Sequence, residues 1–329
     1  MVLPFYPDLP SLSACSTSTK TDGYSDFWYN YATFYHTHAA AIVERNTMTN
    51  IPTPTHIKNL VKLLWPSDPE MAVSPKWLFT RAGSINHNFI KSADVTSEVS
   101  GDLQIVKVNG ESYIWPSKAE LHALMMIVSE LKNSNHPHQY IYGKTVIAPG
   151  DVVIDIGACE GSFSAYAAQQ KATVIAVEPS RIMTQVINAL FDLRGLQKPT
   201  IVNALLGQEP QELYFIDNAE NPGGSRVAST AEAGGYPVPV TTLDSVVSSL
   251  LLEKVDFIKC DAEGADVGIL KSGKNTLEKF RPKLAITTYH GTHDFTDLFS
   301  FLKPLGYKIA GKGLLYTENE FRVLMLHAW

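Results

Sequence analysis

The sequence predicts an α/β protein whose main part is a mostly parallel, seven-stranded sheet with helices between the strands. Beyond residue 150, short apolar runs rich in β-branched residues alternate with helix-like segments, as in parallel βαβ units. A glycine turn follows the first run, and the second run ends in an acidic residue. The last two runs are too close together for a crossover helix, so we expect a hairpin that makes the last strand antiparallel.

The first two strands define the clearest βαβ unit. An apolar run from residue 152 leads to Gly157 and Gly161, which bracket a tight turn, and residues 163–170 predict a short helix. The next strand ends at Glu178, 21 residues after Gly157. Ser180 is then an expected N-cap for an amphipathic helix that ends near Gly195. The full set of predicted strands is 152–158, 173–178, 200–206, 255–260, 284–289, 307–310 and 321–327.

The chain divides near residues 143–150, where the pattern of elements changes. We predict an N-terminal accessory α+β region, residues 1–142, and a catalytic domain, residues 143–329. In the accessory region, Asn109-Gly110 between two alternating runs, 103–108 and 111–115, predicts a hairpin with a type I′ turn. Residues 118–132 predict a helix. The crowded aromatic residues between Tyr24 and Tyr35 predict a helix packed on the main domain, a lid over a substrate, or a homodimer contact.

Composition and charge narrow the class of function. The 329 residues are 45% hydrophobic and 18% charged, which is typical of a globular protein. A formal net charge of −6 argues against nucleic acid as a partner, and no apolar run is long enough to span a membrane. We therefore expect a cytoplasmic protein with a small-molecule substrate. The three cysteines, Cys15, Cys159 and Cys260, lie far apart and are expected to be buried thiols.

The glycine turn favours S-adenosylmethionine over a dinucleotide. Cys159 stands where a dinucleotide site needs a glycine, and its side chain would crowd the pyrophosphate. S-adenosylmethionine has no phosphate. Its ribose hydroxyls suit Glu178, and its amino-acid end suits the amides of the turn and Asp155. The sequence therefore predicts S-adenosyl-L-methionine as a methyl donor.

Several of these segments together resemble the FkbM-type family of class I S-adenosylmethionine-dependent methyltransferases. They are residues 155–161 with Ser164, the Val177-Glu178-Pro179 strand end, residues 242–244 and residues 258–264. The resemblance implies the class I, Rossmann-like fold and methyl transfer, commonly to a hydroxyl of a sugar or natural product. Taken with the position of each residue at the strand ends, the expected donor-binding residues are Asp155, Gly157, Ala158, Cys159, Gly161, Ser164, Glu178, Pro179, Ala204 and Asp261.

This chain departs from the family pattern at two places. Its fourth-strand motif has Cys260 and Ala262, with Asp266 where the family usually has a second glutamate. At the fifth strand, Thr288-Tyr289-His290 keeps the histidine of the family's Glu-x-His pattern but lacks the acid.

Two residues are the expected catalytic groups. His290 lies at the tip of the fifth parallel strand and is the candidate general base, since an unperturbed imidazole titrates near neutrality. Asp261 lies just past the fourth strand and is expected to orient that base, to take the proton itself, or to hold the amino group of the donor. His290 and His293 with Asp261 or Asp294 would form a metal-binding set, but such pairs are common by accident and we predict no metal.

The sequence thus predicts an O-methyltransferase that acts on a hydroxyl of a small molecule. An N-methyltransferase would use the same donor site and remains an alternative. A second alternative, an NAD-dependent oxidoreductase, is disfavoured by Cys159. A third is a non-catalytic module, which would bind S-adenosylmethionine but show no turnover with any acceptor.

Overall fold

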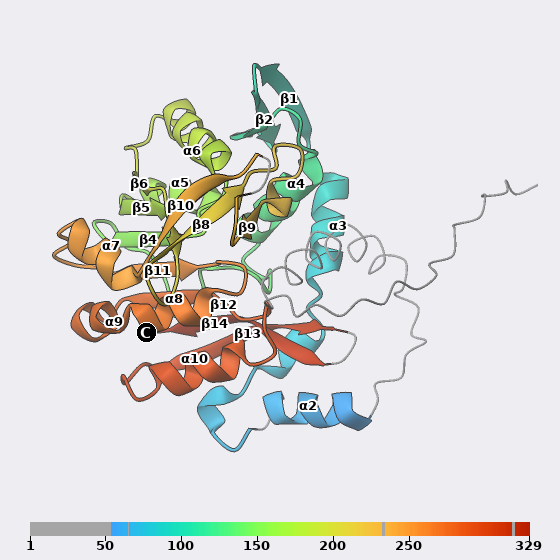
Figure 1. The fold of residues 1–329 in the computed structure, drawn as a ribbon. Coiled ribbons are helices and arrows are strands. Elements are labelled where there is room, and N and C mark those ends of the chain that lie inside the picture. The colour runs from blue at the N-terminus through green and yellow to red at the C-terminus, as the bar shows by residue number, and fades with distance from the viewer. Residues whose placement is uncertain (1–53, 65, 232–233, 318–319) are drawn as a thin grey trace, which may run out of the picture.

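The computed structural model describes residues 54–64, 66–231, 234–317 and 320–329 (Figure 1). Its main sheet has seven strands in the order β13-β14-β12-β11-β4-β5-β6. Only β14 runs opposite to its neighbours, since it pairs antiparallel with both β12 and β13. The expected class of sheet is therefore confirmed. The strands are β4 (Val152–Ile156), β5 (Thr173–Val177), β6 (Thr200–Val202), β11 (Phe257–Cys260), β12 (Lys283–Thr287), β13 (Ile309–Tyr316) and β14 (Phe321–Ala328).

Helices cover both faces of this sheet because successive strand residues alternate between them. One face packs on α7 (Leu243–Ser249), α8 (Asp266–Ser272), α9 (Lys274–Phe280) and α10 (Asp294–Leu302). The other face packs on α5 (Ser162–Gln169) and α6 (Arg181–Arg194). The Ser180 Oγ accepts a hydrogen bond from the Met183 amide at the start of α6, and Gly195 ends that helix at φ 60°. Both predicted ends of this helix are thus confirmed.

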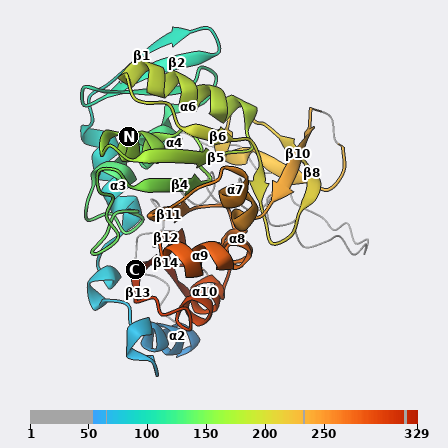
Figure 2. The same cartoon turned by 90° about the vertical axis from the view of Figure 1, so that its left-hand side faces the viewer.

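A second, four-stranded sheet was missed by the sequence analysis. It contains β7 (Leu205–Leu206), β10 (Tyr236–Thr241), β8 (Gln211–Ile216) and β9 (Arg226–Ala228) in that order. The predicted single strand 200–206 is therefore wrong. The chain leaves the main sheet after Val202, where the side-chain amide of Asn203 donates to the carbonyl of Glu178, and β7 then pairs with β10. Figure 2 shows β8 and β10 extending beyond one side of the main sheet.

The hairpin at the end of the chain is longer than predicted. We expected Gly311-Lys312-Gly313 between the two strands, but β13 runs through these residues to Tyr316. A Cβ at Gly311 would lie 2.9 Å from Cγ2 of Val73, and a Cβ at Gly313 would lie 2.8 Å from Cβ of Pro137. The glycines therefore mark a close approach of the N-terminal region to this strand.

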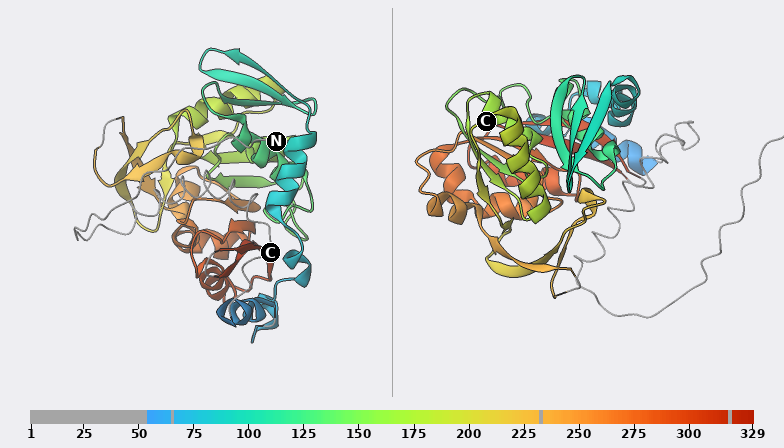
Figure 3. Two further views of the ribbon diagram at one scale, coloured as in Figure 1. Left: turned by 90° about the vertical axis from the view of Figure 1, so that its right-hand side faces the viewer. Right: turned by 90° about the horizontal axis from the view of Figure 1, so that it is seen from above.

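The N-terminal region packs along α6 and the end of the main sheet (Figures 2 and 3). Its predicted hairpin is confirmed, with Asn109 at φ 51° and Gly110 at φ 83° in the turn. A third strand, β1, was missed, and the predicted helix 118–132 begins only at residue 121. The elements are α2 (Pro54–Leu64), η1 (Pro69–Met71), η2 (Pro75–Leu78), α3 (Ala82–Ser92), β1 (Val95–Ser100), β2 (Leu103–Val108), β3 (Glu111–Pro116) and α4 (Leu121–Lys132).

Two further predictions depend on which residues the structure describes. The aromatic segment from Tyr24 to Tyr35, with its proposed lid or homodimer contact, lies outside them. Within the described part of the chain, no helix has the length and apolar character needed to cross a membrane.

Candidate active site

The predicted site residues meet at the carboxyl ends of four adjacent strands. In the sheet, β12, β11, β4 and β5 are neighbours and run parallel. Their carboxyl ends carry His290, Asp261, the Gly157 turn and Glu178, in that order. This edge is where ligands collect in open α/β sheets.

The two glycines of the turn allow close packing of protein on protein. Gly157 has φ +70°, and a Cβ there would lie 2.0 Å from the backbone oxygen of Asp261. Gly161 has φ +80°, and its Cβ would lie 2.9 Å from Cγ1 of Ile187 on α6. Both glycines are expected donor-binding residues, which stays a prediction. The structure shows that each one also has a protein neighbour that excludes a side chain.

Asp155 and Ser164 lie beneath the turn and are completely buried. The Ser164 hydroxyl donates to Asp155 Oδ2 at 2.6 Å, and Lys259 Nζ lies 3.1 Å from Asp155 Oδ1. The lysine also donates to the carbonyl of Gly157 at 2.5 Å. Although burial alone would lower it, the pKa of Lys259 is raised by the carboxylates of Asp155 and Asp261, so the lysine stays charged. This ion pair joins β4 to β11 and holds the turn.

Glu178 closes the other side of the turn. Its Oε2 accepts from the amide of Cys159 and its Oε1 from the amide of Ser180, each at 2.8 Å. Burial raises the pKa of this carboxyl to about 7, against the two amide hydrogen bonds, which lower it. Each carboxylate oxygen has a second lone pair, so Glu178 still has the capacity to accept hydroxyl groups.

The remaining predicted donor residues differ in exposure. Cys159 and Pro179 are half-buried, whereas Ala158 and Ala204 are buried. Cys159 has the left-handed φ of 47°, and burial together with Glu160 and Glu178 raises the pKa of its thiol well above the usual value. A cavity beside Pro179 is also lined by Asn203 and, from the second sheet, by Tyr236. Asn203 directly precedes Ala204, which is one of the expected donor-binding residues.

Three residues from the N-terminal region complete the site, and the sequence analysis missed them. The Tyr140 hydroxyl donates to Asp261 Oδ2 at 2.6 Å. His138 Nε2 lies 4.0 Å from the same oxygen, while its Nδ1 lies 2.9 Å from Glu130 Oε2. Burial alone would raise the pKa of Asp261. Lys259 and the neighbouring histidines outweigh this effect and keep that pKa below its ordinary value, so this half-buried group is a carboxylate. The sequence signal that could have pointed to this contribution is that seven of the ten histidines lie before residue 150.

His290 lies between two acids. Its Nε2 is 3.1 Å from Glu263 Oε2, and its Nδ1 is 3.5 Å from Asp266 Oδ2. Burial alone would lower the pKa of His290, but these carboxylates outweigh it and raise that pKa well above 6.5. This shift favours the protonated ring, and the role of His290 as a general base, which assumed an unperturbed imidazole, stays a prediction.

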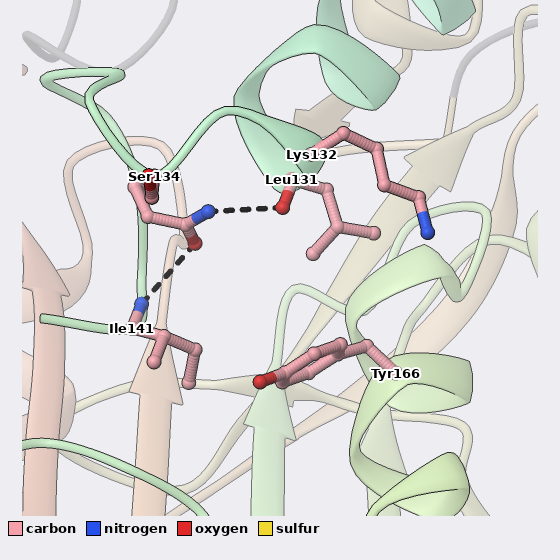
Figure 4. Close-up of a pocket in the computed structure, with 6 residues that line it drawn as sticks. Leu131, Lys132, Ser134, Ile141 and Tyr166 are labelled. Carbon is pink, nitrogen blue, oxygen red and sulfur yellow. Dashed lines mark hydrogen bonds between the residues drawn. The ribbon is translucent and has the colours of Figure 1, made fainter.

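A second small cavity lies away from these groups. It is lined by Leu131, Lys132, Ser134, Gln139, Ile141 and Tyr166, between the end of α4 and α5 (Figure 4). Gln139 spans it through hydrogen bonds from its amide nitrogen to the carbonyl of Leu131 and from the amide of Ile141 to its oxygen. None of its lining residues belongs to the predicted donor or catalytic set.

Residues 155–309 match the family model described as the methyltransferase FkbM domain. No curated protein matches the chain. Among solved structures, an FkbM methyltransferase from Methylobacillus flagellatus is 19% identical over 64% of this chain and 56% of its own, with a TM-score of 0.42. A precorrin-6Y C5,15-methyltransferase from Geobacter metallireducens is 15% identical over 61% and 90%, with a TM-score of 0.37. A putative methyltransferase from Streptococcus mutans, in complex with S-adenosylhomocysteine, is 11% identical over 58% and 95%, also with a TM-score of 0.37.

Proposed function

We propose that the protein is a methyltransferase that uses S-adenosylmethionine, as the match of residues 155–309 to the FkbM methyltransferase domain indicates, and that it methylates a hydroxyl group of a small molecule. The observation that carries the proposal is the half-buried carboxylate of Asp261. It lies at the end of β11, beside the glycine turn, and Tyr140 holds it in place. An alcohol loses its proton as it attacks, and this site offers acidic and imidazole groups that bind such a hydroxyl.

The donor end of the proposal rests on residues that fit S-adenosylmethionine. Glu178 retains acceptor capacity for ribose hydroxyls, and the half-buried Gly157, Cys159 and Pro179 lie around it. Asp155 and Ser164 would act indirectly, because they are buried beneath the turn and support it. The donor supplies an electrophilic methyl group, while the protein aligns the two reactants and excludes water.

The acceptor end combines both predicted regions of the chain. Asp261 and His290 come from the catalytic domain, and Tyr140 and His138 come from the accessory region, residues 1–142. We propose that this region is part of the active site. We propose a sugar or other natural product as the acceptor, and a cytoplasmic location. The net charge of −6 argues against nucleic acid as the acceptor. A homodimer contact through residues 24–35 stays a proposal.

An assay that measures the formation of S-adenosylhomocysteine from S-adenosylmethionine tests the proposal. We would compare pairs of sugars and polyols that carry either a hydroxyl or an amine at the same carbon. Methylation of the hydroxyl member is expected. Turnover with the amine members alone would instead establish the N-methyltransferase alternative.

One variant then tests the position of the acceptor. Tyr140→Phe removes the hydroxyl that donates to Asp261 and should lower kcat by about tenfold, as for one lost hydrogen bond to a charged group, with unchanged affinity for S-adenosylhomocysteine. Tyr166→Phe is the matched control, because this half-buried phenol lines the separate cavity. Equal kcat values for the two variants would remove Tyr140 and Asp261 from the acceptor site.

A further inference from the structure

Two histidines of the site are held in the same way. In His138, Nδ1 lies 2.9 Å from a carboxylate oxygen of Glu130, and in His290, Nδ1 lies 3.5 Å from one of Asp266. A carboxylate at Nδ1 fixes the proton on that nitrogen and leaves the Nε2 lone pair for another partner. This arrangement is typical of histidines that bind metals, whose second nitrogen is commonly oriented by an acid.

Both Nε2 atoms face one pair of carboxylates. His290 Nε2 is 3.1 Å from Glu263 Oε2, and His138 Nε2 is 4.0 Å from Asp261 Oδ2. Ligand atoms of Asp261, Glu263 and His290 all lie within 4.8 Å of one another. Ligands of a single ion at about 2.1 Å are separated by about 3 Å when adjacent and about 4.2 Å when opposite, so these spacings need only small adjustments.

His138 provides an independent indication of a ligand. Its side chain is only 9% exposed, and its Nε2 has no hydrogen bond to any of the described residues. Buried polar atoms are rarely left in this state, and a missing ligand or ion is one established cause. The atom faces the cluster, since its nearest acidic neighbour is Asp261.

We propose that His138, Asp261, Glu263 and His290 bind one divalent transition-metal ion. The mixture of imidazole and carboxylate ligands suits manganese, iron, cobalt or zinc better than magnesium or calcium, which prefer oxygen alone. Four protein ligands leave two positions of an octahedral ion open. The set differs from the one weighed from the sequence, because His293 is exposed and Asp294 accepts a hydrogen bond from the Gly291 amide.

The charge of the cluster also favours a dication. Lys259 is paired with Asp155, while Glu130, Asp261, Glu263 and Asp266 surround the two imidazoles. Without a metal ion, protons on the imidazoles offset part of the charge of these four carboxylates. Imidazoles that bind a metal ion are neutral, so the carboxylates then leave four negative charges in a largely buried region, which is costly without a cation. A bound dication would halve that excess.

The location suggests what the ion would hold. It would lie at the ends of β11 and β12, beside the Gly157 turn, where the methyl acceptor is expected. Resting on the proposed function, we infer that the open positions take neighbouring oxygens of the acceptor, such as a vicinal diol. Coordination makes a hydroxyl more acidic and fixes its direction toward the donor.

Cobalt(II) binding tests the site without any methyl transfer. Protein treated with a chelator is titrated with Co²⁺, and both visible absorption and calorimetry are recorded. We expect one ion per chain, with d–d bands typical of nitrogen and oxygen ligands. Glu263→Gln and His138→Gln should each weaken binding at least tenfold. Asp297→Asn, which changes an exposed carboxylate on α10, should leave it unchanged.

The controls keep the two proposals separate. Melting temperatures without metal would show that Glu263→Gln, a half-buried change, leaves the fold intact. Absent Co²⁺ binding by the native protein, or equal binding by Glu263→Gln, His138→Gln and Asp297→Asn, would overturn the metal site. Full methyl transfer in the presence of a chelator, without Co²⁺ binding, would overturn it too and leave the proposed function intact.

Discussion

Replacing Gly157 by alanine tests the structural explanation of the glycine turn. At φ +70° an alanine is strained by about 1 kcal/mol, and its Cβ would lie 2.0 Å from the backbone oxygen of Asp261. That neighbour is a backbone atom, so relief requires a shift of the segment after β11. Overpacking of this kind costs about 1–3 kcal/mol, and the total expected loss of stability is about 2–4 kcal/mol.

Gly195→Ala is the matched control. This glycine also has a left-handed backbone, at φ +60°, but a Cβ there would meet nothing within 4 Å. Its expected cost is therefore only the conformational part, about 1 kcal/mol. Urea unfolding of both variants measures the difference. Equal stabilities would refute the contact with Asp261, and if Gly157→Ala then lost only affinity for S-adenosylhomocysteine, the glycine would be explained by the ligand after all.

Two further predictions concern the donor site and the N-terminal region. The pKa of Glu178 is raised to about 7, so the carboxyl is protonated below that pH and ionised above it. If ribose hydroxyls bind the ionised form, the affinity for S-adenosylhomocysteine should rise about tenfold from pH 6 to pH 8. Calorimetry should show this rise in the native protein and a flat, weaker profile in Glu178→Ala; a flat native profile would contradict the assignment. Arg194 donates from Nε and Nη2 to the carbonyl of Ser112 and pairs with Glu111, so Arg194→Ala should lower the free energy of unfolding by about 1–3 kcal/mol. Lys198→Ala, which removes an exposed pair with Asp192, should cost less than about 0.5 kcal/mol, and similar losses for both variants would show that α6 does not hold the hairpin.

The sequence by itself determined the local elements of the fold. Alternating and continuous apolar runs predicted the main parallel strands, Asn109-Gly110 predicted the hairpin, and Ser180 and Gly195 predicted the ends of α6. These features depend on the conformational preferences of neighbouring residues, which a sequence displays directly. The family-specific segments in residues 155–264 likewise predicted the resemblance to the FkbM methyltransferase domain, whose family model matches residues 155–309.

Only the tertiary structure decided which distant residues meet. Tyr140 and Asp261 are 121 positions apart, and their hydrogen bond depends on how the N-terminal region packs against the sheet. The same packing brings His138 to the site and explains Gly313, whose Cβ would meet Pro137. The raised pKa of His290 also arises from Glu263 and Asp266, which approach it only in the folded chain. Side-chain identity sets what each group can do, but burial and neighbouring charges, which are properties of the fold, set what it does at this site.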